Sequence, residues 1–253
     1  MVKILAIGNS FSEDSTKYLY DLANCDKVPL KVVNLFLGGC CLENHWNNIL
    51  ENNAEYDYQL NGKSSGKHVS ILESLQEEDW NIITIQQCSG FSGIMNSYYP
   101  YAGLISDYIK KHAPNSQQFI HQTWAYEIDS DHSHFSFYNN NQDEMYDALF
   151  RCYNKIASEL SLNIIPFGEV IQKIRTLPIF NYKMGGKSLC RDGFHMNEVY
   201  GRYALAATWY AYILKKDILN NSFKPPIIDG VIASEEEIKQ IKDSIIYTLS
   251  HSK

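Results

Sequence analysis

Two short stretches far apart in the chain contain residue types that can perform nucleophilic catalysis. Ser10 lies in ILAIGNSFSEDS (residues 4–15), after an apolar run, and Asp192 and His195 stand three residues apart in CRDGFH. A serine hydroxyl attacks a carbonyl group only when a base accepts its proton and a third group orients that base. Together the two stretches therefore contain the three side chains of a serine hydrolase triad.

Each stretch also has an ordinary structural explanation. Ser10 or Ser12 can cap a helix whose first turn contains Glu13, since a hydroxyl acceptor and negative charge both stabilise a helix N-terminus. A third explanation is a phosphate-binding loop of the flavodoxin kind. The D-x-x-H spacing alone also describes a loop with a capping aspartate and a surface histidine. The combination favours the triad, because a phosphate loop needs neither Asp192 nor His195.

Apolar strands that alternate with amphipathic helices predict the scaffold of these residues. We expect strands at 2–7, 31–37, 80–86, 117–124 and 161–168. We expect helices at 11–25, 98–112, 142–160, 197–215 and 234–250. Nearly continuous apolar strands indicate a parallel sheet that is covered on both faces. The sequence therefore predicts one α/β domain over residues 1–253, a three-layer α/β/α sandwich around a central, mostly parallel five-stranded sheet.

Composition excludes several classes of partner. The formal net charge of −7 argues against nucleic acid or an anionic membrane as the main partner. No apolar run approaches the ~20 residues of a membrane-spanning helix, so we expect no membrane insertion. The six cysteines show no C-x-x-C pair, which favours reduced thiols. The sequence as it stands predicts a cytoplasmic protein, or a secreted or periplasmic one if a signal peptide has been removed.

Two long polar connections are expected at residues 51–67 and 127–141, and loops of this length are often lids or disordered segments. The second contains His132 and His134 beside acidic residues. A His-x-His pair without a spaced third ligand is more typical of a polar loop than of a metal site. The sequence therefore predicts no metal and no cofactor.

Four blocks of the chain together resemble the SGNH (GDSL-type) hydrolase superfamily. They are GNSFS, LGGCCLENH, TIQQCSG and DGFH, in this order. The chain is most similar to a bacterial branch that also contains W-x-I-x-x-Q-Q and H-Q-T-W-A-Y. The resemblance implies a flavodoxin-like α/β/α fold and the hydrolysis of esters or acetyl groups without a cofactor.

The resemblance also implies a role for each triad residue. Ser10 corresponds to the nucleophile, His195 to the general base and acid, and Asp192 to the carboxylate that orients the histidine. Arg191 stands next to Asp192, where it either pairs with that carboxylate or binds an anionic substrate group.

An oxyanion hole with three donors is implied as well. In the superfamily the donors are the backbone N–H of the nucleophile, the N–H of a glycine in the second block and an asparagine side chain in the third. Ser10 and Gly39 match the first two, with Gly38 as the alternative glycine. The asparagine is absent, and QQCSG occupies its place. A glutamine amide offers the same donors, so we expect Gln87 to be the third, with Gln86 as the alternative.

Four residues near these blocks are candidates for substrate binding. Asn9 replaces the aspartate that the superfamily usually has before the nucleophile, a change that we expect to alter a local hydrogen bond. His45 follows the glycines of the second block and is either a substrate contact or a surface residue at a helix start. Trp124 and Tyr126 lie at the end of the fourth strand and either stack on a sugar or pack in the core.

The sequence thus predicts a serine esterase or acetylesterase that hydrolyses small acyl esters, such as O-acetyl groups on carbohydrates. The expected partner is a small-molecule or glycan ester. One alternative is an acyltransferase that uses the same triad with an alcohol as acceptor. Another is a catalytically weak glycan-binding module on the same fold.

Overall fold

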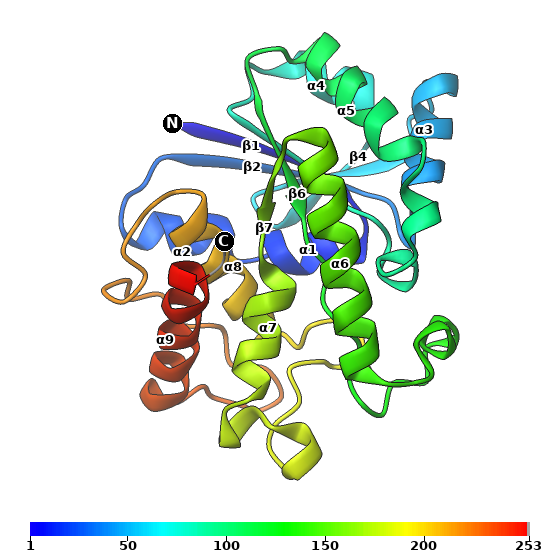
Figure 1. Cartoon of the computed structure of the whole chain (residues 1–253). Helices are drawn as coiled ribbons and strands as arrows, with labels where there is room; N and C mark the ends of the chain where they lie inside the picture. Colours follow the sequence, from blue (N-terminus) through cyan, green and yellow to red (C-terminus); the bar gives the residue numbers. More distant parts are fainter. Residues whose placement is uncertain (252–253) are drawn as a thin grey trace.

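The computed structural model describes residues 1–251, and its centre is a seven-stranded sheet (Figure 1). The strands are β1 (Val2–Gly8), β2 (Leu30–Phe36), β3 (Tyr56–Leu60), β4 (Lys63–Val69), β5 (Ile82–Ile85), β6 (Gln117–His121) and β7 (Asn163–Ile165). Their order across the sheet is β4-β3-β2-β1-β5-β6-β7. The five strands from β2 to β7 in this order pair in parallel, which confirms the mostly parallel sheet that the sequence predicts.

The prediction of five strands was wrong, because the polar connection at 51–67 contains most of a hairpin. Strands β3 and β4 pair antiparallel, and β3 extends the sheet beyond β2. Asn61 and Gly62 form the turn with positive φ angles of 50° and 77°. An Asn-Gly pair favours this two-residue turn because both residues tolerate positive φ. All residues of β4 except the last are exposed, so the strand lacks the apolar alternation by which strands are recognised.

Helices cover both faces of the sheet, as the prediction of three layers requires. They are α1 (Ser10–Thr16), α2 (Leu19–Cys25), α3 (Leu42–Glu51), α4 (Ile71–Glu77), α5 (Tyr101–His112), α6 (Gln142–Leu160), α7 (Phe167–Arg175), α8 (Gly201–Tyr212) and α9 (Glu235–His251). Helices α3, α4 and α5 contact one another, and α6 contacts α5. Helices α1 and α2 pack on α8, and α9 packs on α7 and α8 (Figure 1).

The helix expected at 11–25 is divided into α1 and α2. The hydroxyl groups of Ser15 and Thr16 donate to the carbonyl oxygen of Ser12, at 3.0 Å and 2.8 Å. Such hydroxyl bonds to the preceding turn compete with the backbone and bend helices. Helix α1 is therefore short, and it lies at the carboxyl end of β1.

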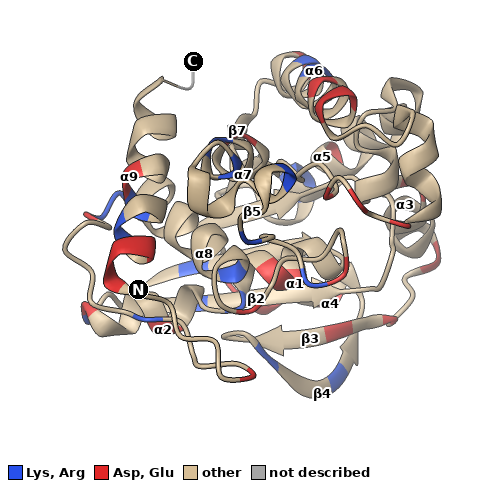
Figure 2. Cartoon of the chain, turned by 90° about the horizontal axis from the view of Figure 1, so that it is seen from below, with Lys and Arg blue, Asp and Glu red and all other residues tan. Residues whose placement is uncertain are grey.

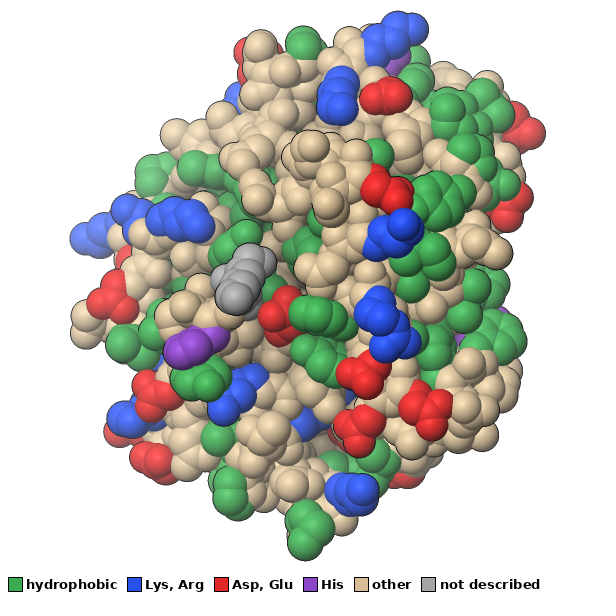
Figure 3. Space-filling view, viewed as in Figure 1, with side chains coloured by type: hydrophobic (Ala, Val, Ile, Leu, Met, Phe, Trp, Pro, Cys, Tyr) green, Lys and Arg blue, Asp and Glu red, His purple; other side chains and the backbone are tan. Residues whose placement is uncertain are grey.

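Charged side chains of both signs share the surface of the molecule. On the face shown in Figure 3, lysine and arginine side chains are interspersed with aspartate and glutamate side chains. In the view from below, acidic and basic segments also lie close together around α1 and α8 (Figure 2). Among the helices of residues 1–251, none combines the length and the apolar character needed to cross a bilayer.

Candidate active site

Asn9 connects three loops beneath Ser10 and does not face a ligand. Its side-chain oxygen accepts hydrogen bonds from the N–H of Phe11 at 3.0 Å and from Nε2 of Gln86 at 2.7 Å. Its Nδ2 donates to the carbonyl oxygen of Cys40 at 2.9 Å. Asn9 is buried, so the expectation of a substrate contact was wrong, and the expected local hydrogen bond is present. The residue fixes Ser10, the first residue of α1, at the edge of the sheet.

Ser10, His195 and Asp192 lie together in a continuous chain of hydrogen bonds. Ser10 Oγ lies 2.8 Å from His195 Nε2, and His195 Nδ1 lies 2.7 Å from Asp192 Oδ2. When Nδ1 donates to the carboxylate, Nε2 is left without a proton and accepts from the serine hydroxyl. This geometry can remove a proton from Ser10.

Asp192 is held as a carboxylate by its own loop. Its Oδ1 accepts the backbone N–H groups of His195 at 2.8 Å and Phe194 at 3.2 Å. Partial burial acts to raise the pKa of Asp192, but the hydrogen bonds from the ring and backbone of His195 and from Phe194 outweigh it and lower that pKa. The carboxylate is thus ionised at neutral pH and orients the imidazole ring.

Asp14 anchors this loop to α1. Its carboxylate is fully buried and accepts hydrogen bonds from Arg191 at 3.0 Å, from Arg202 at 2.8 Å and from the N–H of Met196 at 2.8 Å. Arg191 therefore pairs with Asp14 and not with Asp192, so the first of the two roles expected for it was wrong. Sequence reasoning missed Asp14, although it falls at helical spacing from the apolar Phe11 and Tyr18.

Trp124 and Tyr126 are both fully buried, so the expectation that they stack on a sugar was wrong. The Trp124 ring stacks on Phe11 with centroids 4.1 Å apart, and its Nε1 donates to the carbonyl oxygen of Phe194 at 2.8 Å. The Tyr126 hydroxyl lies 2.8 Å from Ser89 Oγ. Both rings pack in the core, which was the alternative expected for this pair. Trp124 also supports the loop that carries His195.

His45 is also buried and does not reach a ligand site. Its Nδ1 lies 2.8 Å from the hydroxyl of Tyr56, and the two rings stack. Burial lowers the pKa of His45 to about 3, so the ring is neutral. Both roles expected for it, a substrate contact and a surface residue, were wrong, because α3 turns this side chain toward β3.

The two glutamines expected in the oxyanion hole are engaged in holding loops together. Gln87 Nε2 donates to the carbonyl oxygen and to Oγ of Ser97, both at 3.0 Å. Its Oε1 accepts the N–H groups of Leu42 at 3.1 Å and Cys88 at 2.8 Å. Both amide hydrogens of Gln87 are therefore occupied, and the assignment as third donor was wrong. Gln86 is buried and donates to Asn9, so it does not replace Gln87.

Backbone donors remain beside Ser10. Within residues 1–251, the N–H groups of Ser10, Gly38 and Gly39 have no hydrogen-bond acceptor. Gly39 has a φ of +65°, a conformation that a residue with a Cβ adopts at a cost. Both glycines are exposed, so their N–H groups are accessible to an oxyanion.

A row of aromatic rings extends from His195 across the surface, and we call it the aromatic strip. It consists of Phe194, His132, His134, Phe91 and Phe137. Neighbouring ring centroids, beginning at His195, lie between 4.2 Å and 5.2 Å apart. Partial burial and the nearby rings of His134 and His195 lower the pKa of His132. The described part of the chain contains no group of three metal-ligating side chains.

The sequence of this chain matches a family model described as a domain of unknown function (DUF4886), over residues 3–240. The chain belongs to this family. It is 32% identical to a DUF4886 family protein from Bacteroides uniformis ATCC 8492, whose crystal structure superposes with a TM-score of 0.90. The match covers 99% of this chain and 95% of that chain. No curated protein matches the chain.

More distant structures share the fold of this DUF4886 chain. A proposed SGNH hydrolase from Slackia heliotrinireducens is 18% identical, with a TM-score of 0.56 and coverage of 84% of this chain and 98% of that chain. The acetylxylan esterase Axe2 from Geobacillus stearothermophilus is 13% identical, with a TM-score of 0.51 and coverage of 83% of this chain and 92% of that chain. The expected SGNH-type α/β/α fold is therefore confirmed for the DUF4886 chain.

Proposed function

We propose that this protein is a serine esterase that hydrolyses small acyl esters, with Ser10 as nucleophile, His195 as general base and acid, and Asp192 as the orienting carboxylate. The single observation that carries the proposal is the hydrogen-bond chain from Ser10 Oγ through His195 to Asp192. The fold shared with SGNH hydrolases supports it.

The proposed reaction has two acyl-transfer steps. His195 Nε2 takes the proton of Ser10 as Oγ bonds to the ester carbonyl carbon, and the carbonyl electrons move onto the oxygen. His195 then protonates the leaving alkoxide as the ester C–O bond breaks, which leaves an acyl group on Ser10. A water molecule gives its proton to His195 and attacks this acyl group, and Ser10 regains a proton as the acid departs.

Two backbone donors are proposed to stabilise the oxyanion of both steps. The N–H groups of Ser10 and Gly39 are available, with Gly38 as the alternative. Two backbone N–H groups are sufficient in other serine hydrolases, so the hole does not require a glutamine side chain.

Covalent labelling tests the proposed function directly. A fluorophosphonate ester reacts with a serine that has an adjacent base and an oxyanion hole, and we expect it to label Ser10 and to abolish the hydrolysis of 4-nitrophenyl acetate. Peptide mapping by mass spectrometry identifies the labelled residue. Hydrolysis that survives complete labelling of Ser10, or a label on another serine, contradicts the proposal.

Substituting Gly39 tests the oxyanion hole. Alanine at the positive φ of Gly39 is expected to cost about 1–2 kcal/mol and to turn the N–H away, which lowers kcat by about tenfold or more. Gly66 is a matched control, since its φ is +73° and an added Cβ meets no described atom within 4 Å at either glycine. Gly66→Ala is expected to cost similar stability without changing kcat. Equal kcat values in the two variants contradict the role of Gly39.

The aromatic strip is proposed to hold the alcohol part of the ester, because its half-buried rings and the exposed ring of Phe137 suit the face of a sugar. Phe137 is 52% exposed, so Phe137→Ala should leave folding unchanged. We expect it to raise KM for an acetylated xylo-oligosaccharide by about tenfold while kcat and the KM for 4-nitrophenyl acetate change little. Phe150, which is 38% exposed on α6, provides the control Phe150→Ala. An unchanged KM in the Phe137 variant rules out this use of the strip.

A further inference from the structure

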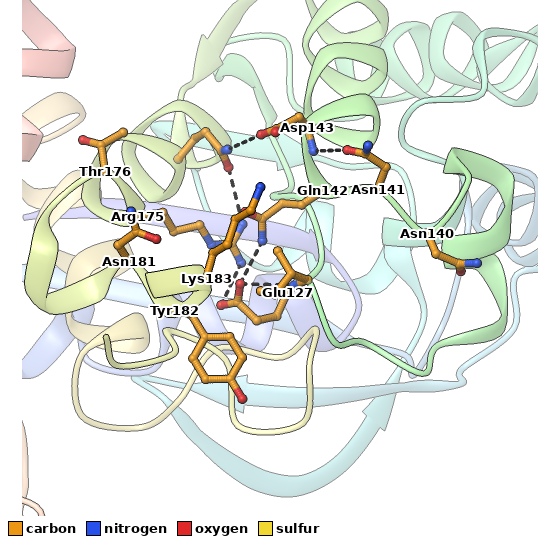
Figure 4. A pocket seen from close by; sticks show the side chains of 12 residues that line it. Glu127, Asn140, Asn141, Gln142, Asp143, Arg175, Thr176, Asn181, Tyr182 and Lys183 are labelled. Carbon is orange, nitrogen blue, oxygen red and sulfur yellow. Dashed lines mark hydrogen bonds and ion pairs between the residues drawn. The ribbon is translucent and has the colours of Figure 1, made fainter. Parts of the chain in front are cut away.

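A polar cavity of about 470 Å³ lies among the start of α6, the end of α7 and the turn Tyr182–Met184 (Figure 4). Its volume falls within the range of small-ligand sites. The triad residues do not line it. It is therefore separate from the site of the proposed ester chemistry.

The wall of this cavity offers both donors and acceptors. Five side-chain amides line it: Asn140, Asn141, Gln142, Gln172 and Asn181. In the described part of the chain, the amides of Asn140 and Asn181 have no hydrogen-bond partner, and the oxygen of Gln142 has none either. An amide presents an acceptor and two donors side by side, an arrangement that suits neighbouring hydroxyl groups.

The floor contains a buried guanidinium with few good partners. Arg175 is 7% exposed, and its one short hydrogen bond is to the carbonyl oxygen of Ala125 at 2.9 Å. It also donates to Oε1 of Gln172 at 3.5 Å, its contacts with Glu127 and Cys190 are both 3.6 Å long, and its Nε has no partner among residues 1–251. All but one of these contacts are long, so a ligand hydroxyl at the small exposed part of Arg175 can add a shorter one.

Charge and shape select the class of ligand. The formal charges of Arg175 and Lys183 balance those of Glu127 and Asp143, so the cavity favours an uncharged molecule. Among the lining residues, Tyr182 carries the only aromatic ring, and it is 36% exposed. One ring beside a polar wall suits a sugar, which has a C–H face and a hydroxyl edge. A nucleobase, by contrast, is typically sandwiched between apolar or aromatic side chains.

We propose that this cavity binds a sugar unit of a neutral glycan, with the ring of Tyr182 against one face and the amides and Arg175 on its hydroxyl groups. The site goes beyond the proposed esterase activity and does not depend on it. Tyr182 also borders a second cavity of about 300 Å³, which Asp192 and Gly193 line. A glycan held by the first cavity can therefore extend along Tyr182 toward the loop of His195.

The experiment is a titration of ¹⁵N-labelled full-length Ser10→Ala protein, followed by NMR, with xylotetraose, cellotetraose and mannotetraose to about 10 mM. We expect at least one of these to bind saturably and to shift the side-chain amide signals of Asn140, Asn181 and Gln142. Tyr182→Ala is expected to weaken that binding by about tenfold. Tyr182→Phe keeps the ring and should bind like the parent.

Several outcomes of this titration would contradict the proposed sugar site. If none of the three tetrasaccharides binds, if the shifts lie outside the cavity, or if Tyr182→Ala binds as tightly as the parent, the assignment is overturned. Binding of an acidic glucuronate-bearing oligosaccharide alone also overturns it, because the cavity would then select an anion. The protein carries Ser10→Ala and the sugars carry no ester, so this outcome is independent of any assay of hydrolysis.

Discussion

Replacing Ser10 with alanine is expected to lower the hydrolysis of 4-nitrophenyl acetate by about 10⁴-fold or more, because the attacking oxygen is lost. His195→Ala should cause a similar loss. The double variant should be no slower than either single variant, since the two residues act as one unit. Initial rates for the three variants, measured with protein whose folding has been checked by circular dichroism, provide the comparison.

Ser116→Ala is the matched control for the Ser10 variant. Ser116 precedes β6, at the amino edge of the sheet, and its hydroxyl bonds only to the carbonyl oxygen of Ala113 among the described residues. Its loss should leave the rate unchanged. A Ser10 variant that keeps more than about a tenth of the parent rate would show that another group performs the hydrolysis, and Ser10 would then be only the first residue of a helix.

Asp14→Asn is expected to lower the free energy of unfolding by about 3–5 kcal/mol, the usual cost of breaking a buried ion pair. The substitution removes the negative charge that Arg191 and Arg202 share and places an N–H₂ group near two guanidinium groups. It should also lower kcat, because the N–H of Met196, next to His195, loses its charged acceptor. Urea denaturation and the esterase assay measure the two effects.

Asp21→Asn serves as the control for this substitution. Asp21 is an exposed carboxylate in the first turn of α2, where loss of charge should change stability by less than about 0.5 kcal/mol. If Asp14→Asn costs no more than this, the carboxylate does not anchor the loop. If stability falls while kcat is unchanged, the anchor serves folding alone.

Sequence patterns predicted the parallel part of the sheet because its strands are nearly continuous apolar runs. Sequence patterns placed only Ser10 at the carboxyl end of a strand; the expectation that His195 meets it came from the resemblance of GNSFS and DGFH to SGNH hydrolases. The β3–β4 hairpin was missed because β4 has no apolar face, although Asn61-Gly62 was a usable signal. A pattern of residue types shows which groups can donate, but not whether neighbouring loops already use those donors.

The substrate contacts were predicted less well, for a physical reason. Trp124 and Tyr126 follow a buried strand, and the sequence does not show that the chain stays inside the molecule for six residues beyond β6, residues 122–127. Gln87 has the chemistry of an oxyanion donor, but Ser97 lies close enough to take both of its hydrogens. Phe91 and Phe137 stand far apart in the sequence, and only the fold brings their rings together beside His134.

The loop that carries His195 is held by Asp14 from the start of the chain and by Trp124 from its middle, while His195 reaches Ser10 across 185 positions. The triad therefore cannot assemble on a growing chain until the ribosome has released all three segments. Contacts of such long sequence separation also form late and slowly in folding. Esterase activity, if Ser10 provides it, would thus report the completion of folding across the whole sheet, and a partly folded chain would be inactive.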